Sequence, residues 1–149
     1  MQELLSTPPF QIYLASVILL GFNLLALANN TALTRAGAQE VVNPEDEVLN
    51  KGAKVVYEAA NDKTERYRRA HRNALENIPL FLITGFLLTL LGISQTVAAA
   101  LFGVFVVARI SHSVCYIRGI QPFRTLSFGI GAIDQAVVLI WIGYLTFMG

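Results

Sequence analysis

Charged residues are scarce in this chain, and the places where they are missing are informative. Asp, Glu, Lys and Arg make up 14% of the 149 residues, whereas 54% are hydrophobic. No lysine or arginine precedes Arg35 or follows Arg124, and none lies in the short turn between Gly92 and Gln95. A composition this apolar, with its charges grouped, excludes an ordinary soluble domain and is typical of an integral membrane protein.

Cysteine and histidine are also rare, and each shortage excludes a type of site. The single cysteine, Cys115, rules out a disulfide within the chain, and its apolar neighbours predict a buried, unreactive thiol. The two histidines, His71 and His112, have no cluster of further ligands around them, so we expect no metal. No basic patch with interleaved aromatic residues is present, which argues against nucleic-acid binding.

Four apolar segments are present, over about residues 10–28, 77–91, 96–116 and 126–147. Each is close to the ~20 residues that cross a ~30 Å hydrocarbon layer, the second only if its polar start is included. Backbone hydrogen bonds must be satisfied internally in lipid, which predicts helices. We therefore predict an all-α integral membrane protein with a single domain over residues 1–149. Its helices are expected over about 10–34, 65–91, 96–117 and 124–147, with a loop over about 35–64.

The lysines and arginines gather on two connections. Eight of the eleven lie between Asn29 and Arg72, and the others, Arg109, Arg118 and Arg124, lie in or beside the turn between the third and fourth helices. By the positive-inside rule, both connections face the cytoplasm and both termini lie on the opposite side. Either a bacterial inner membrane or the endoplasmic reticulum would satisfy this topology.

The long loop contains a helix start of its own at Asn43–Asp46. Asn43 can cap, Pro44 suits the first helical position, and the acids that follow complement the helix dipole. We expect a short element here that covers the mouth of the bundle. The next helix is expected to be capped by Asp62 or Thr64.

That second membrane helix begins with the densest charge in the chain. Helical spacing places four polar residues on one face, at i, i+3, i+4 and i+7: Arg69, Arg72, Asn73 and Glu76. Charges carried into lipid are expensive and normally face a polar site inside a bundle. A basic cluster that only sets topology would account for the neighbouring arginines, but not for Asn73 and Glu76.

The third and fourth helices carry matching polar groups. Arg109, His112 and Tyr116 share a face of the third helix, and Arg124 and Thr125 open the fourth. A tight turn at Gln121–Phe123 should join the two helices as an antiparallel hairpin. We expect these groups to meet those of the second helix in a cationic pocket, made by Arg69, Arg72, Asn73, Glu76, Arg109, His112, Tyr116 and Arg124.

Several arginines around one carboxylate suggest a ligand with more than one anionic group and at least one ammonium. Arginine binds carboxylates with two parallel hydrogen bonds, and Glu76 suits an amine. Structural interpretations remain open for three residues. His112 would then only form a hydrogen bond between helices, and Tyr116 would belong to the aromatic belt at the membrane interface. Arg109 would be a structural charge, neutralised by Asp134 at a similar depth in the membrane.

This pattern resembles the MAPEG family, the membrane-associated proteins in eicosanoid and glutathione metabolism. The family's characteristic segment is matched by Glu65-Arg66-x-x-Arg69-Ala70-His71-x-Asn73-x-x-Glu76. Asn43–Asp46 upstream, and Ala108–Tyr116 and Pro122–Arg124 downstream, fall in the expected order and spacing, so the likeness covers nearly the whole chain. The chain is most similar to the microsomal glutathione transferase and prostaglandin E synthase branch. Phe128, where prostaglandin E synthases have tyrosine, favours the transferases.

The resemblance implies a fold, a ligand and a set of site residues. Members are four-helix bundles that assemble as homotrimers and bind glutathione between protomers near the cytoplasmic face. Glutathione has two carboxylates, one ammonium and one thiol, as the pocket anticipates. Arg124 would hold the thiolate with Thr125 beside it, and Arg35 would reach in from the first helix. The other binding residues would be Arg72, Asn73, Glu76, His112 and Tyr116, to which we add Arg69 and Arg109.

We therefore expect a membrane-bound glutathione transferase that conjugates glutathione to hydrophobic electrophiles in detoxification and reduces lipid hydroperoxides as a peroxidase. A glutathione-dependent isomerase of the prostaglandin type is the alternative enzyme, distinguished by whether glutathione is consumed. A non-catalytic lipid-binding membrane protein of the same fold is the alternative of another class. A transporter or channel is disfavoured, because the charges crowd one end of the membrane.

Overall fold

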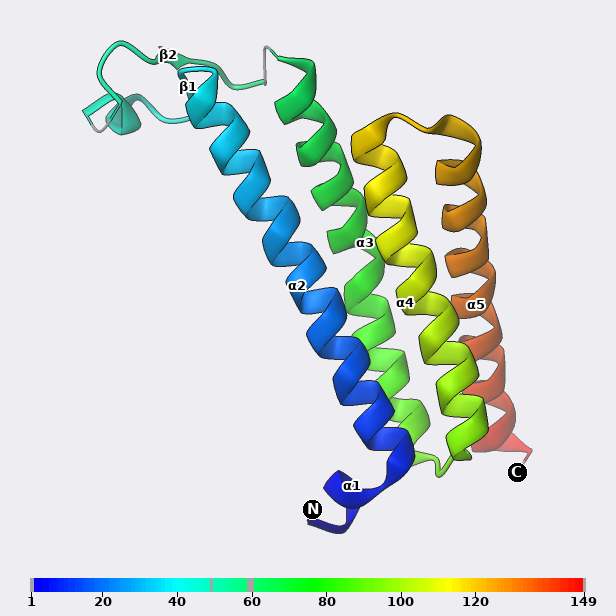
Figure 1. Ribbon diagram of the computed structural model, residues 1–149. Coiled ribbons are helices and arrows are strands. Elements are labelled where there is room, and N and C mark those ends of the chain that lie inside the picture. Colours follow the sequence, from blue (N-terminus) through cyan, green and yellow to red (C-terminus); the bar gives the residue numbers. More distant parts are fainter. Residues whose placement is uncertain (1, 49, 59–60, 149) are drawn as a thin grey trace.

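A bundle of four long helices forms the molecule (Figure 1). The computed structural model describes residues 2–48, 50–58 and 61–148. Residues 1 and 149, the predicted ends of the domain, and loop positions 49, 59 and 60 lie outside this description. The helices are α2 (Pro8–Gly37), α3 (Asp62–Leu90), α4 (Gln95–Arg118) and α5 (Gln121–Phe147), after a short α1 (Gln2–Ser6). All four long helices are apolar enough to cross a membrane, which confirms the predicted all-α fold class.

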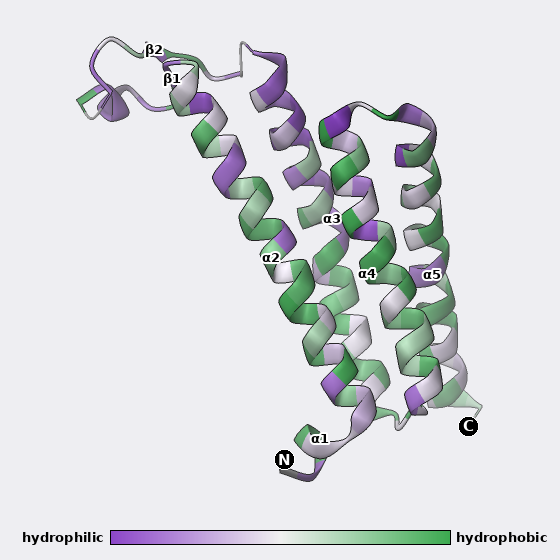
Figure 2. Cartoon of the chain, viewed as in Figure 1, coloured by the Kyte–Doolittle hydropathy of each residue, from purple (hydrophilic) through white to green (hydrophobic). Residues whose placement is uncertain are grey.

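The chain runs up and down the bundle, so that both termini lie at one end (Figure 1). We call the other end, where α2 leads into α3 and α4 into α5, the polar end. Helices α3 and α4 occupy the middle and contact each other and both outer helices, whereas α2 and α5 share no contact among the described residues. Figure 2 shows hydrophilic residues concentrated at the polar end and apolar residues along most of the remaining length.

The start of α3 corrects the expected cap. The Asn61 side-chain oxygen accepts a hydrogen bond from the Thr64 N–H at 2.8 Å, so the cap is Asn61 and not Asp62 or Thr64. Asparagine is among the best capping residues, and its position one residue earlier lets the acidic Asp62 fall in the first turn, where it favours the helix dipole.

The connection between α4 and α5 is shorter than expected. Gly119 ends α4 with a φ of 71°, in the left-handed conformation that glycine adopts without strain. Gln121 and Pro122 lie inside the first turn of α5, which corrects their assignment to the preceding turn. Proline fits there because the first N–H groups of a helix have no partner within it. The two helices still form the predicted antiparallel hairpin (Figure 1).

The loop between α2 and α3 is a small folded element beside α2. It contains two short parallel strands, β1 (Glu40–Val41) and β2 (Lys54–Val55), and a 3-10 helix, η1 (Pro44–Val48). The predicted helix start therefore becomes one short 3-10 element. In the part of the chain that the structure describes, η1 contacts only the two strands, so it does not cover the bundle mouth as we expected. The buried carboxylate of Glu40 accepts from Asn61 Nδ2 at 3.4 Å, which ties the loop to the start of α3.

An aromatic core joins α2, α3 and α4 on the side of the bundle toward the two termini. It is made by Tyr13, Phe81, Phe102 and Phe105. Phe81 stacks on Phe105 with ring centroids 4.4 Å apart and meets Phe102 edge-on at 5.5 Å. The Tyr13 hydroxyl donates to the Leu82 carbonyl at 2.8 Å. Aromatic pairs of this kind each add about 0.5–1.5 kcal/mol beyond the burial of their area.

Two hydrogen bonds between side chains tie the outer helices to the middle ones. Asn23 of α2 donates to Ser113 of α4 at 3.1 Å, and Gln135 of α5 donates to Thr84 of α3 at 2.7 Å. Gln135 and Thr84 are both buried. Polar bonds of this kind between membrane helices are worth about 0.6–2 kcal/mol each.

Candidate functional site

The polar side chains of α4 and α5 converge in an α4–α5 cluster, formed by Arg109, His112, Tyr116 and Arg124. The His112 Nδ1 atom lies 2.9 Å from the Arg124 backbone carbonyl. The Arg124 guanidinium lies over the Tyr116 ring, 4.8 Å from its centroid, and the His112 ring meets Tyr116 edge-on at 5.6 Å. A cation over an aromatic face gains about 0.5–2 kcal/mol, depending on how far it is desolvated. The cluster therefore holds Arg124 through both its backbone and its side chain.

The contact with the Arg124 carbonyl fixes the tautomer of His112. A carbonyl oxygen only accepts, so Nδ1 of the neutral ring carries the proton and Nε2 keeps a lone pair. The ring is buried, and Nε2 has no partner among the described residues. Leaving a buried acceptor unpaired costs about 1–3 kcal/mol, so a ligand that supplied a donor would bind favourably here.

Arg109 is the largest of the fully buried side chains, with 2% of its surface exposed. Its Nη2 atom donates to the Phe128 carbonyl at 3.2 Å, and its guanidinium lies 5.3 Å from the ring centroids of Phe105 and Phe128. It occupies the space beside Gly131, where a Cβ atom would collide with the guanidinium. Gly131 therefore provides the room that lets α4 carry an arginine into the bundle.

The predicted ion pair between Arg109 and Asp134 is wrong. Asp134 is buried, but its Oδ2 atom has no partner, and no ion pair joins it to Arg109 within the described residues. The two residues were matched by depth alone. Depth along a helix does not fix the direction in which a side chain points, and the guanidinium donates instead to the Phe128 carbonyl, six residues before Asp134 on α5.

The predicted α3 residues lie apart from the α4–α5 cluster. Arg69, Arg72 and Glu76 are exposed, and Asn73 is half-buried with an unpartnered Oδ1 atom. Over the described ranges, no hydrogen bond or ion pair joins these four residues, which we call the α3 face, to the α4–α5 cluster. A single copy of the chain thus presents two groups of predicted site residues that do not meet.

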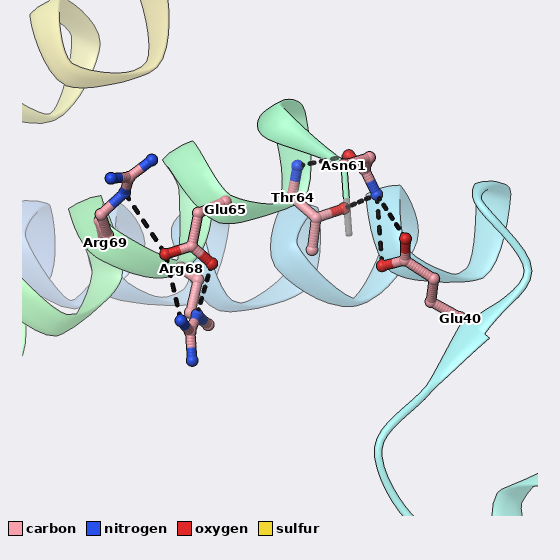
Figure 3. A network of polar contacts seen from close by, with 6 residues as sticks. All are labelled: Glu40, Asn61, Thr64, Glu65, Arg68 and Arg69. Atoms are coloured by element: carbon pink, nitrogen blue, oxygen red, sulfur yellow. Dashed lines mark hydrogen bonds and ion pairs between the residues drawn. The ribbon is translucent and has the colours of Figure 1, made fainter. Parts of the chain in front are cut away.

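The first turns of α3, before its apolar run, hold a compact ion network (Figure 3). Arg68 donates to Glu65 from Nε at 2.8 Å and from Nη2 at 3.1 Å, and the Arg69 Nε atom lies 3.4 Å from the same carboxylate. The hydrogen bond from Arg68 lowers the pKa of the Glu65 carboxyl, because it favours the charged form. Glu65 therefore orients two arginines, one of which belongs to the α3 face.

Arg35 is also separate from the cluster. It lies in the last turn of α2 and lines a groove of about 350 Å³ together with Glu40 and Asp46 of the loop. Its Nε atom is buried, with no partner in the described part of the chain. Arg35 thus faces the loop beside α2 within one copy of the chain.

Two residues of the polar end were not predicted as parts of the site. Gln121 accepts a hydrogen bond from Arg124 Nη2 at its Oε1 atom, and its Nε2 atom donates to Thr125 Oγ1 at 3.3 Å. The i, i+3 and i+4 spacing of these three residues would have revealed the contact, had the helix start been placed correctly. Arg66 lies against Gly119, where a cation is favoured by the C-terminal end of α4.

An apolar groove of about 680 Å³ runs lengthwise between α4 and α5, and Phe123, in the first turn of α5, is its lining residue nearest the start of that helix. Small residues of α4, among them Ala100 and Gly103, form one side, and Phe123 and Ile130 of α5 form the other. Cys115 also lines the groove and is half-buried, whereas we expected it to be fully buried. The groove could accommodate an apolar molecule between α4 and α5.

A bundle of four membrane-crossing helices, with an arginine, histidine and tyrosine cluster at one end, defines a multi-pass membrane protein with a polar site at that end. Comparison with known proteins gives the family. Residues 13–144 match the MAPEG family, and the chain belongs to it, which confirms the resemblance inferred from the motifs.

Three relatives illustrate the similarity. The chain is 42% identical to human (Homo sapiens) microsomal glutathione S-transferase 1 over 120 residues, which cover 78% of this chain and 76% of the relative. The bovine (Bos taurus) protein of the same name is 40% identical over 119 residues, with the same coverage. Human prostaglandin E synthase is 30% identical over 141 residues, which cover 92% and 91% of the two chains. The matched family range includes both the α4–α5 cluster and the α3 face.

Proposed function

We propose that this protein is a membrane-bound glutathione transferase, which ionises the thiol of glutathione and adds the thiolate to hydrophobic electrophiles. The observation that carries the proposal is the fixed position of the Arg124 guanidinium, over the Tyr116 ring and against Gln121. The relatives named as microsomal glutathione S-transferases support this activity.

The charges of the two residue groups suit glutathione. Arg69 and Arg72 of the α3 face offer cations for the two carboxylates, and Arg124 of the cluster offers one for the thiolate. Glu76 offers a partner for the ammonium, and Nε2 of His112 accepts a peptide N–H. Because three of the four residues of the α3 face are exposed in one copy, we infer that the site is completed between neighbouring protomers of a homotrimer, to which Arg35 also contributes.

The reaction begins with loss of the thiol proton to water. A thiol of pKa near 8.5 is mostly protonated at neutral pH, and only the thiolate is a good nucleophile. An adjacent guanidinium that lowers this pKa by one or two units contributes about 1.4–2.8 kcal/mol. The thiolate then forms a carbon–sulfur bond, and either a leaving group departs or the adduct takes a proton from water.

The same thiolate can reduce a lipid hydroperoxide. It attacks the terminal peroxide oxygen, the O–O bond breaks, and the alkoxide takes a proton to become an alcohol. A second glutathione then converts the sulfenic acid to a disulfide and water. The groove between α4 and α5 supports an apolar second substrate, which would reach Arg124 from the bilayer while glutathione enters from the cytoplasm.

An isomerase of the prostaglandin type is the second candidate. The 30% identity to prostaglandin E synthase extends over 92% of the chain, which is the observation that favours it. In that reaction glutathione would be regenerated, so measuring glutathione before and after turnover separates the two candidates.

The test is the ultraviolet difference absorbance of thiolate when detergent-purified protein is mixed with glutathione. We expect a thiolate signal that disappears in Arg124→Ala and persists in Arg118→Ala, which removes an exposed arginine outside the cluster. Absence of the signal in folded wild-type protein would overturn the proposal and favour a non-catalytic lipid-binding protein.

A further inference from the structure

We propose that Gln121 is a positioning residue that directs both Arg124 and Thr125 toward the glutathione sulfur. The inference rests on the proposed function and adds a residue that the motifs did not include. Gln121 is the first residue of α5, and its side-chain amide lies between the guanidinium of Arg124 and the hydroxyl of Thr125.

The chemistry of the three groups fixes the orientation of this amide. A guanidinium only donates hydrogen bonds, so the atom that meets Arg124 Nη2 must be the amide oxygen. The amide nitrogen then faces Thr125 Oγ1, at 3.3 Å. Because that nitrogen only donates, the threonine oxygen must accept.

This order of donors and acceptors leaves the Thr125 hydroxyl as a hydrogen-bond donor. Its oxygen is engaged by the amide, so its own proton points away from Gln121 and is free to be donated. A thiolate accepts such a proton in a hydrogen bond, and hydrogen bonding to the charged form stabilises that form. Arg124 and Thr125 would therefore stabilise the same sulfur, one by charge and one by a hydrogen bond.

The position of Arg124 also depends on Gln121. The guanidinium is bounded by the Tyr116 ring on one side, 4.8 Å from the centroid, and its Nη2 atom is taken by Gln121. Without the amide, the long side chain keeps only the contact with the ring. The guanidinium would then sample more conformations, and fewer of them would place its charge beside the sulfur.

Two substitutions test this role in different ways. Gln121→Met keeps a similar volume but removes both hydrogen bonds, and we expect the thiolate fraction at saturating glutathione and neutral pH to fall about threefold. Gln121→Glu places a carboxylate on Arg124 and neutralises it, which should raise the pKa of the bound thiol by about one unit, a roughly tenfold change in ionisation. The readout is a pH titration of the thiolate difference absorbance.

A matched control is available at the opposite end of the bundle. Gln95 is the exposed first residue of α4, as Gln121 is of α5, so Gln95→Glu introduces the same charge at the same helical position. This variant should keep the wild-type thiol pKa. Melting temperatures of all variants separate loss of structure from loss of positioning.

The outcomes distinguish this inference from the proposed function. If wild-type protein forms thiolate and both Gln121 variants titrate as it does, Gln121 has no positioning role. A lower melting temperature with an unchanged thiol pKa would also overturn the inference, because it would make Gln121 purely structural. No thiolate in wild-type protein would instead overturn the proposed function.

Discussion

One stripe of α4 belongs to two regions of different character. Phe102 and Phe105 enter the aromatic core, and Arg109, His112 and Tyr116 continue along the same face into the α4–α5 cluster. In the core, Phe102 and Phe105 each pack against the ring of Phe81. In the cluster, Arg109 and His112 keep buried nitrogen atoms without partners over the described residues. Buried nitrogen atoms without partners cost free energy until a ligand pairs with them, and the aromatic core next to the cluster on α4 keeps these atoms in place. This arrangement is expected where a polar ligand binds.

Damage to the core should have the largest effect. Phe81 is fully buried and stacks on Phe105, so Phe81→Ala should destabilise the bundle by about 3–5 kcal/mol. Denaturation in detergent or lipid measures the change. Phe86→Ala, which truncates a more exposed ring, is the control, and an equal loss in both variants would contradict a localised core.

A smaller effect is expected at the junction between the two regions. A methyl group at Gly131 would collide with the buried Arg109 guanidinium, so Gly131→Ala should cost about 1–3 kcal/mol and weaken glutathione binding. Gly129 has open space around it, which makes Gly129→Ala the matched control. If both variants behave alike, the space beside Gly131 is not what accommodates Arg109.

His112 allows the two functions of one cluster residue to be separated. Asparagine can keep the donor to the Arg124 carbonyl but has nothing in place of Nε2, whereas phenylalanine loses both. We expect His112→Asn to melt near the wild-type temperature and to bind glutathione about tenfold more weakly, about 1.4 kcal/mol. Calorimetric titration with glutathione measures this. An unchanged affinity for glutathione would mean that His112 serves only to hydrogen-bond α4 to α5.

The smallest effect is expected in the ion network of α3. The pKa of Glu65 is lowered in the folded protein, so its contribution to stability is present above its unfolded pKa and is lost as the pH falls through the folded value. Glu65→Gln should therefore cost no more than about 1 kcal/mol at neutral pH and nothing in strong acid. Glu45→Gln, in the exposed 3-10 helix, serves as the control in parallel denaturation experiments.

Much of the fold could be predicted because hydropathy and charge depend only on the order of residues. Four apolar runs predicted four helices, and the grouped arginines placed the polar end. Contacts between helices were harder, since spacing gives depth along a helix but not the angle at which a side chain meets its neighbour. The Arg109–Asp134 pair failed for this reason, and the space beside Gly131 leaves no trace in the sequence pattern.

The polar site was predicted by residue type more successfully than by geometry. Tyr116, His112 and Arg124 do lie together, because one short turn fixes how α4 faces α5. We expected the α3 face beside these three residues, but in a single chain most of its side chains are exposed. What packs against the α3 face cannot be predicted from the sequence of one copy. The sequence does not reveal the role of Gln121, because the proline after it predicts a turn as readily as the helix start that the structure shows.

The groove between α4 and α5 has a consequence for how turnover would be measured. Its lining reaches from Ala99 to Cys115, about 24 Å along α4, so it opens along the length of the bundle and not only at its end. On the proposed function, the electrophile arrives sideways from the lipid while glutathione arrives from water. The apparent KM for the electrophile would then follow its mole fraction in the bilayer. Adding empty vesicles should slow the reaction, whereas diluting the suspension with buffer containing the same glutathione should leave the rate per enzyme unchanged.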